Sequence, residues 1–132
     1  MVLNSEPVSL DIGLLTLRLS AGGAMIWHHG WPKLANFTEV MDKFGDPIGL
    51  GPAISLGLIV FAETVCAALV ALGLWTRLST LPVIVGMAVA AFVSNGDQPF
   101  KVKELALCYM MAFLAIFLTG SGRFSIDRLK FS

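Results

Sequence analysis

Two single charges of opposite sign lie near the middle of two apolar stretches of this chain. Arg18 lies within residues 10–31, and Glu63 lies within residues 51–75. An isolated charge at the centre of a bilayer costs at least about 2.5 to 3.5 kcal/mol, so such charges normally face protein, pair with each other or line a functional cavity. We therefore interpret Arg18 and Glu63 as a polar core inside a membrane. Their chemistry could be that of a structural salt bridge, or that of a ligand or proton site.

A second polar layer is predicted near the membrane face that lies away from the chain termini. His28, His29 and Lys33 end the first apolar stretch, and Glu104 begins the last one. A histidine near a carboxylate can exchange protons or hydrogen-bond a quinone headgroup, because histidine titrates near neutral pH. We expect a ligand or proton site here, in which His29 bonds the headgroup and Glu104 exchanges protons with solvent. The alternative is that the histidines only anchor the helix at the interface.

Metal and disulfide chemistry are not favoured by the spacing of the remaining candidates. His28 and His29 are adjacent, so on a helix they point about 100° apart and do not easily hold one ion together. We predict no metal site. Cys66 and Cys108 lie inside apolar runs and outside any C-x-x-C motif. A redox pair requires their Cα atoms to lie within about 7 Å, which the sequence leaves open, and packing in an apolar core is the simpler interpretation.

The composition indicates an integral membrane protein. Of 132 residues, 56% are hydrophobic and 14% are charged, whereas an average soluble domain is about 25% charged. The formal net charge is zero, so there is no electrostatic signature of a nucleic-acid-binding protein. No basic segment precedes the first apolar run, and we expect a chain that begins at Met1 without a cleaved signal.

The elements that must position these residues are predicted to be membrane-crossing helices. A hydrocarbon core about 30 Å thick needs about 20 helical residues. The expected fold is a single all-α domain, a transmembrane four-helix bundle. Its predicted helices cover residues 10–31, 51–75, 78–95 and 103–120.

A short amphipathic helix is predicted between the first two spans, over residues 36–44. Its apolar positions follow the i, i+3, i+4, i+7 spacing of one helical face, and they are Phe37, Val40, Met41 and Phe44. Such a helix suits the headgroup region of a bilayer. The alternative is a helix packed onto protein.

Depth along the four antiparallel helices suggests that Arg18 and Glu63 meet. Counted from the side that holds the termini, they lie roughly 12 and 18 Å deep at 1.5 Å per residue, a difference that an arginine side chain can span. The orientation of the bundle is not predicted, because the Lys and Arg residues on the two sides balance. One side has Arg77, Arg123, Arg128 and Lys130, and the other has Lys33, Lys43, Lys101 and Lys103.

The third predicted helix carries a stripe of small residues at four-residue spacing. The stripe consists of Pro82, Gly86, Ala90 and Ser94. Such stripes allow two helices to approach closely. The stripe could serve packing within the chain or form the seam of a homo-oligomer.

Several short motifs together resemble the DoxX family of small four-helix bacterial membrane proteins, over residues 17–127. They occur in a specific order. The motifs are Leu17-Arg18-Leu19 with Gly22-Gly23, His29-Gly30-Trp31-Pro32-Lys33-Leu34, Glu63, Leu72-Gly73-Leu74-Trp75-Thr76-Arg77, Glu104-Leu105-Ala106-Leu107 and Gly120-Ser121-Gly122-Arg123-Phe124-Ser125-Ile126-Asp127.

The resemblance implies a redox setting rather than a defined reaction. The family is similar to the membrane subunit of thiosulfate:quinone oxidoreductase, and some members are linked to oxidative-stress complexes. It marks a set of polar positions without assigning any a catalytic role: Arg18, His29, Lys33, Glu63, Arg77, Glu104 and Asp127. The chain has no haem, flavin or iron–sulfur motif, so we expect no intrinsic cofactor, and a bound quinone or a redox partner protein would carry electrons.

The sequence thus favours a membrane subunit or accessory of a redox complex in the bacterial inner membrane, with lipid as its surroundings. Two alternatives stay open. One is a small-molecule transporter or export component with a midplane site at Arg18 and Glu63. The other is a non-catalytic scaffold that recruits a partner through its tail and the amphipathic helix. The substrate, the electron donor and the oligomeric state are not predicted.

Overall fold

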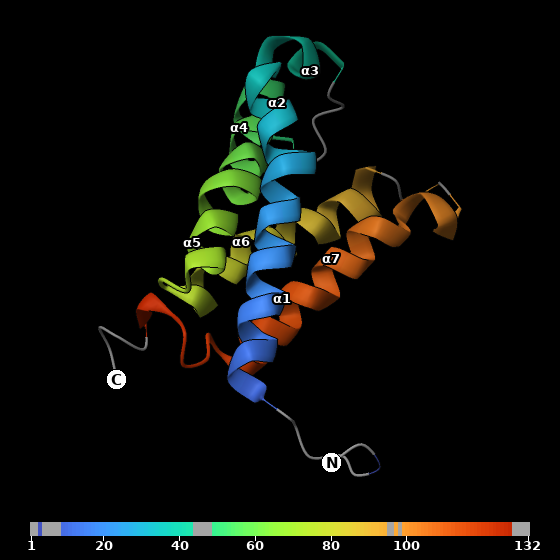
Figure 1. Ribbon diagram of the computed structural model, residues 1–132. Coiled ribbons are helices and arrows are strands. Elements are labelled where there is room, and N and C mark those ends of the chain that lie inside the picture. The colour runs from blue at the N-terminus through green and yellow to red at the C-terminus, as the bar shows by residue number, and fades with distance from the viewer. Residues whose placement is uncertain (1–2, 4–8, 44–48, 95–96, 98, 128–132) are drawn as a thin grey trace.

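The computed structural model describes residues 3, 9–43, 49–94, 97 and 99–127, and these residues form helices and connecting turns without any strand (Figure 1). The first continuous helix consists of α1 (Leu10–Met25), the π turn η1 (Ile26–Gly30) and α2 (Trp31–Ala35). The short helix α3 (Phe37–Lys43) follows. The other elements are α4 (Pro52–Phe61), the π turn η2 (Ala62–Cys66), α5 (Ala67–Leu72), α6 (Thr76–Val89), the π turn η3 (Ala90–Ser94) and α7 (Phe100–Thr119).

Three of these continuous helices are long and apolar enough to cross a membrane. They cover Leu10–Ala35, Pro52–Leu72 and Thr76–Val93. The protein is therefore all-helical with membrane-like helices, as the composition indicates. The expected crossing by the fourth helix, α7, and the interfacial position of α3 stay predictions. Phe44, Asn95, Arg128 and Lys130 lie outside the described residues.

Local sequence explains three of the helix ends. Ser9 caps α1, because its side chain accepts a hydrogen bond from the backbone N–H of Ile12 at 3.3 Å. Gly51 precedes Pro52, the first residue of α4, where a missing N–H is harmless. Gly73 ends α5 in the left-handed region, at φ 75°, which favours glycine.

The first helix runs to residue 35 rather than 31, although Pro32 lies within it. The π turn η1 ends at Gly30, just before α2. A π turn already departs from regular i→i−4 bonding, and Pro32 then takes a first-turn position of α2, where proline is tolerated.

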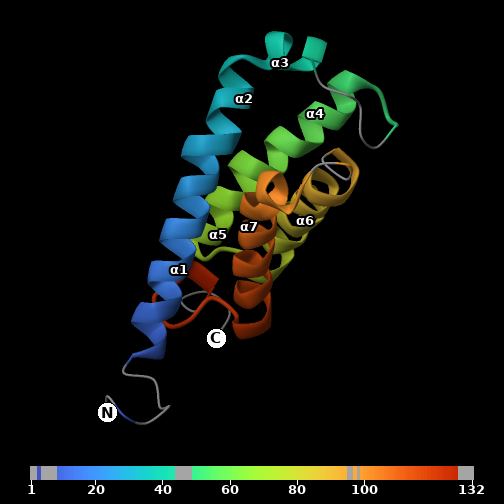
Figure 2. The same cartoon turned by 90° about the vertical axis from the view of Figure 1, so that its right-hand side faces the viewer.

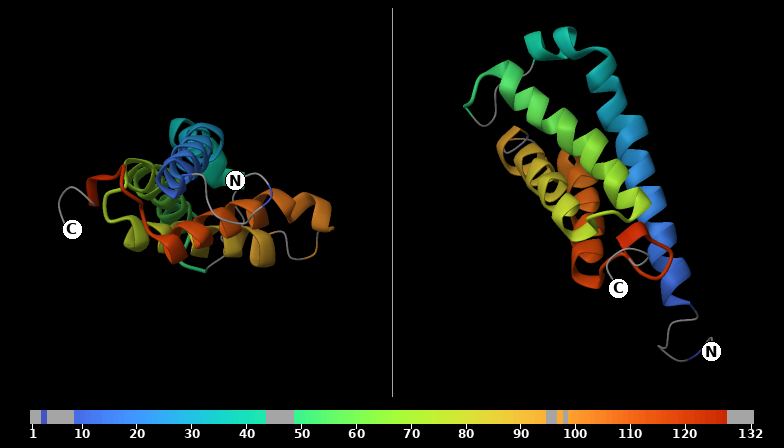
Figure 3. Two further views of the ribbon diagram at one scale, coloured as in Figure 1. Left: turned by 60° about the horizontal axis from the view of Figure 1, so that its bottom comes forward. Right: turned by 90° about the vertical axis from the view of Figure 1, so that its left-hand side faces the viewer.

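The helices form two layers (Figure 3). In one layer, α1–α2 and α4–α5 run side by side, and α3 joins them at the end away from the N-terminus (Figure 2). In the other layer, α6 and α7 pack along each other. The segment after α7 folds back to the end of α5 (Figure 1).

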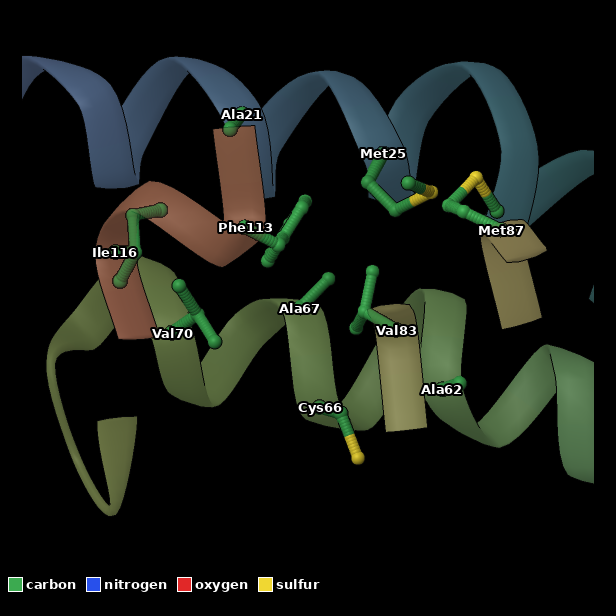
Figure 4. Packing of buried hydrophobic residues seen from close by; sticks show 10 residues of the cluster. All are labelled: Ala21, Met25, Ala62, Cys66, Ala67, Val70, Val83, Met87, Phe113 and Ile116. Carbon is green, nitrogen blue, oxygen red and sulfur yellow. The ribbon is translucent and has the colours of Figure 1, made fainter. Parts of the chain in front are cut away.

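The core lies where the two layers meet, and all four long helical segments contribute to it (Figure 4). Met25 from α1 faces Val83 and Met87 from α6, while Phe113 from α7 lies near Ala67. These side chains are almost completely buried. This apolar contact holds the two layers together.

Candidate functional site

An ion pair between Lys33 and Glu63 lies at the centre of the candidate site. The Lys33 Nζ lies 2.8 Å from Glu63 Oε1 and 2.9 Å from Oε2. The Glu63 side chain is 2% exposed and that of Lys33 is 29% exposed. The expected pairing of Glu63 with Arg18 is therefore wrong, because the Glu63 carboxylate pairs with Lys33 instead.

The register of the first two long helices explains this pairing. Gly30 lies directly against the backbone of Glu63, so that a Cβ on Gly30 would come 2.6 Å from the Glu63 carbonyl oxygen. Lys33 is three residues further on and shares that face of the helix. Arg18 instead lies against Gly73, about 18 Å from Gly30 along the helix axis. The expected depths of roughly 12 and 18 Å assume a register between the two helices that the structure does not have.

His29 joins this cluster through a ring contact with Tyr109 of α7. The two ring centroids are 5.1 Å apart and the planes are nearly perpendicular, at 84°. This edge-to-face arrangement is a favourable geometry for aromatic pairs. Tyr109 also interacts electrostatically with Glu63, and His29 with Lys33. His29, Lys33, Glu63 and Tyr109 therefore form one polar cluster, which we call the upper cluster.

The π turns place two members of the upper cluster. His29 lies in η1 and Glu63 lies in η2, and the two turns contact each other. A π turn contains one residue more than a regular turn and so rotates the side chains that follow it. Sequence periodicity assumes regular α-helix and does not reveal this rotation.

Two residues of the predicted layer do not belong to the upper cluster. His28 and Glu104 are both exposed, and no contact joins Glu104 to His29 in the described part of the chain. Glu104 precedes Tyr109 by five residues, so their side chains leave α7 about 140° apart. The charge pattern of the sequence did not point to Tyr109. Tyr109 is the one tyrosine of the chain and lies inside an apolar helix, and that unusual position is a signal by which it can be found.

A groove of about 290 Å³ opens beside Tyr109 between α1 and α7. Its other lining residues are mostly apolar and small, and they are Leu17, Ser20, Ala21, Leu105, Cys108 and Ala112. Cys108 is an exposed free thiol there, whereas Cys66 is a buried free thiol on a different groove, between α4, α5 and α6. The structure therefore places the two thiols in separate grooves.

Arg18 belongs to a second polar cluster near the termini. It is 1% exposed, and its Nη2 donates a hydrogen bond to the Phe124 carbonyl oxygen at 2.6 Å. Its Nε and Nη1 have no hydrogen-bond partner among the described residues. The carboxylate of Asp127 lies close enough to interact electrostatically with Arg18. Arg18 is thus compensated by the C-terminal segment rather than by Glu63.

Asp127 caps the start of α6 from a distant part of the chain. Its Oδ1 accepts a hydrogen bond from the N–H of Trp75 at 2.7 Å, and its Oδ2 accepts bonds from the N–H and hydroxyl of Thr76 at 2.8 and 2.7 Å. Burial alone would raise the pKa of Asp127, but these hydrogen bonds and the nearby Arg18 outweigh it and lower that pKa. Arg77 is another of the polar positions marked by the family resemblance. Its Nε donates a hydrogen bond to the Phe117 carbonyl oxygen at 3.0 Å and so links α6 to α7.

Among the described residues, no group of three or more His, Cys, Asp or Glu side chains is placed to hold a metal ion.

The DoxX family model matches residues 13–96, which is more than half of the chain. The chain belongs to the DoxX family. A curated relative, an uncharacterized protein of Haemophilus influenzae (strain ATCC 51907 / DSM 11121 / KW20 / Rd), is 30% identical over 98 residues. That match covers 70% of this chain and 65% of the relative, so the chain spans slightly less than two thirds of it. No solved structure matches the chain.

The matched region includes some residues of the candidate site of this DoxX protein and leaves others out. Arg18, His29, Lys33, Glu63 and Arg77 lie inside it, whereas the residues of α7 and the following segment lie beyond it. Tyr109 and Asp127 complete the two clusters from outside the matched region. The expected family role of Glu104 and Asp127 therefore depends on the motif resemblance alone.

Proposed function

We propose that this DoxX-family protein is a multi-pass protein of the bacterial inner membrane that serves as a quinone-binding subunit or accessory of a redox complex. The observation that carries the proposal is the upper cluster. It combines the ring contact between His29 and Tyr109 with an ion pair whose carboxylate is buried. His29, Lys33 and Glu63 lie in helices that are apolar enough to cross a membrane. Intramembrane ionisable groups of this kind are functional candidates by default.

The proposed architecture is a four-span bundle. The α7 helix has 20 residues, which at 1.5 Å per residue reach about 30 Å, the thickness of a hydrocarbon core. It packs against α6 and the π turn η3, which supports a fourth crossing. The α3 helix joins α2 to α4 at one end of the molecule (Figure 2), the place where an interfacial helix would lie.

The residues around the upper cluster fit a quinone in chemistry. The imidazole of His29 and the hydroxyl of Tyr109 are groups that can hydrogen-bond headgroup oxygens. The groove beside Tyr109 is lined mainly by apolar side chains, which suits the ring and the start of an isoprenoid tail. A quinone takes up electrons and protons in equal number when it is reduced to the quinol, and a partner protein would supply the electrons.

Each residue of the upper cluster has a proposed task. His29 and Tyr109 orient the headgroup. Lys33 and Glu63 form the protein side of the site, and Lys33, which is partly exposed, connects the buried carboxylate with the membrane surface. Glu104 is exposed, so its proposed exchange of protons would be with solvent rather than directly with His29.

Protection of Cys108 from a maleimide tests this proposal, since Cys108 is an exposed thiol that lines the groove. We expect a short-tailed ubiquinone analogue to slow labelling of Cys108 in the reconstituted protein. His29→Ala and Tyr109→Phe should each weaken this protection by a few-fold up to about tenfold, the value of one hydrogen bond.

His28→Ala is the matched control, because His28 is the neighbouring histidine and is exposed. It should leave the protection unchanged. Labelling of wild-type Cys108 that does not respond to the analogue would contradict quinone binding in this groove. Equal protection in all variants would remove His29 and Tyr109 from the proposed site.

A further inference from the structure

A cleft of about 570 Å³ lies at the terminal end of the molecule, away from the upper cluster. It is formed by the first turns of α1, the first turn of α6 and the segment that follows α7. Its lining residues are Leu10, Asp11, Leu14, Trp75, Thr76, Arg77, Leu78, Thr119, Gly120, Ser121, Gly122 and Asp127. The proposed function uses none of them.

The cleft contains the guanidinium of Arg77 and the carboxylate of Asp11, and this carboxylate can accept a further hydrogen bond. Arg77 is held by its Nε on the Phe117 carbonyl. Gly120 packs close to the guanidinium, because a Cβ there would come 3.3 Å from Arg77 Nη2. Asp11 accepts the N–H of Arg123 at Oδ1, whereas its Oδ2 accepts no hydrogen bond from the described part of the chain. Asp127 already uses both oxygens on Trp75 and Thr76.

Arg77 and Asp11 do not form an ion pair with each other among the described residues. Both line the same cleft, so a ligand that carries both signs of charge would satisfy both. A phosphate would bind the guanidinium of Arg77 in the manner that arginine favours. A primary ammonium on the same ligand would bind Asp11.

An apolar groove of about 670 Å³ continues from this cleft between α4, α5 and α6. Trp75 and Leu78 line both the cleft and the groove. The remaining lining of the groove is almost entirely apolar and includes Phe61, Leu69 and Val85. A cleft with charged side chains at the end of membrane-like helices and an apolar groove that shares two of its lining residues are the two parts that a lipid needs.

We infer that this composite site binds one phospholipid with an ethanolamine headgroup. The phosphate lies on Arg77, the ammonium lies on Asp11, and one acyl chain occupies the groove. The exposed ring of Trp75 lies at the junction, the depth at which tryptophan is enriched in membrane proteins. The small residues Pro82 and Gly86 line the groove, so part of the small-residue stripe faces the acyl chain. This site is independent of the quinone proposal.

Native mass spectrometry from micelles that contain equal amounts of phosphatidylethanolamine, phosphatidylglycerol and phosphatidylcholine tests the site. We expect a monomer that retains one phosphatidylethanolamine. Arg77→Gln should lower phospholipid retention about tenfold, which corresponds to the loss of a charged hydrogen bond. Asp11→Asn should reduce the preference for phosphatidylethanolamine over phosphatidylglycerol. Arg123→Gln is the matched control, because Arg123 lies at the same end but does not line the cleft, and it should change neither.

Gly86→Leu tests the groove without relying on the fold at Arg77. A Cβ at Gly86 meets no atom within 4 Å, so the leucine should be accommodated and should occupy the space of the acyl chain. We expect this variant to lose lipid retention while its thermal unfolding stays unchanged. Lipid retention that is equal in all variants would overturn the inference. So would a protein dimer that Gly86→Leu dissociates, or binding of glycerophosphoethanolamine alone that is as tight as that of the lipid.

Discussion

Lys33 and Glu63 form one ion pair but are buried to different extents. Glu63 is 2% exposed, and the partner side chain of Lys33 is 29% exposed. Removing one member of a buried pair leaves the other charge uncompensated. The loss of folding stability should therefore depend on which of the two residues is replaced.

We predict that Lys33→Met destabilises the protein more than Glu63→Gln. The first variant leaves an unpaired carboxylate in the interior, at a cost of about 3 kcal/mol, whereas the lysine left by the second can turn toward water. The double variant should recover part of the loss. Unfolding in detergent measures all three, and equal losses in the two single variants would contradict the asymmetry.

Asp127 makes stability depend on pH, because its pKa in the folded protein lies below its usual value. Its contribution to stability is complete above the ordinary aspartate pKa near 3.8, and it is lost as the pH falls through the lower folded-state value. We expect Asp127→Asn to be less stable than wild type at neutral pH and to lose less stability on acidification.

Thr76→Val provides an intermediate case for Asp127. This variant removes the hydroxyl that donates to Oδ2 but keeps the backbone N–H. Its pH dependence, followed by unfolding from neutral pH down to about pH 3, should lie between those of wild type and Asp127→Asn. A Thr76→Val curve identical to that of Asp127→Asn would mean that the hydroxyl alone lowers the pKa.

At the scale of elements, glycines determine how closely α1 approaches α5. A Cβ on Gly22 would come 2.7 Å from the Ala67 carbonyl oxygen and 2.9 Å from the Ala71 Cβ. The next residue, Gly23, has nothing within 4 Å of such a Cβ. Two adjacent glycines thus offer a matched test of helix packing.

We predict that Gly22→Ala destabilises the protein by about 1 to 3 kcal/mol, since backbone must move to admit the methyl group. Gly23→Ala should be neutral or stabilising by up to about 1 kcal/mol, because alanine favours helix. Thermal unfolding of the two variants provides the comparison. A tolerated Gly22→Ala would mean that α1 and α5 are further apart than the structure has them.

At the scale of the whole molecule, the first turn of α1 and the segment after α7 meet on one side. Asp11 in the first turn of α1 accepts a hydrogen bond from Arg123 after α7, at 3.0 Å. The N–H of Asp127 donates to the Gly73 carbonyl at the end of α5, at 2.8 Å. A four-span arrangement satisfies these contacts, because an even number of crossings returns the chain to its starting side.

We therefore predict that reporters fused to the N-terminus and to the C-terminus report the same side of the membrane. Fusions whose activity depends on the compartment measure this directly, and a fusion in the segment between α3 and α4 should report the opposite side. Termini on opposite sides would mean that α7 does not cross and that the protein has three spans.

Local sequence indicated the all-helical, membrane-like character of this protein, the starts of α1 and α4, and its family. These properties follow from composition and from nearest neighbours, such as Ser9 before α1 and Gly51 before Pro52. The motifs of residues 17–127 also led to the DoxX family, which the family model supports over residues 13–96. Each of these signals lies within one short stretch of chain.

Only the tertiary structure decided which charges meet. Arg18 and Glu63 are both buried, as their positions indicated, but Glu63 bonds Lys33 and Arg18 bonds the Phe124 carbonyl. The α6 helix begins at Thr76 because Asp127, far along the chain, accepts its N–H. These pairings depend on the register between helices, which close contacts at Gly22, Gly30 and Gly73 set. Spacing within one helix carries no information about that register.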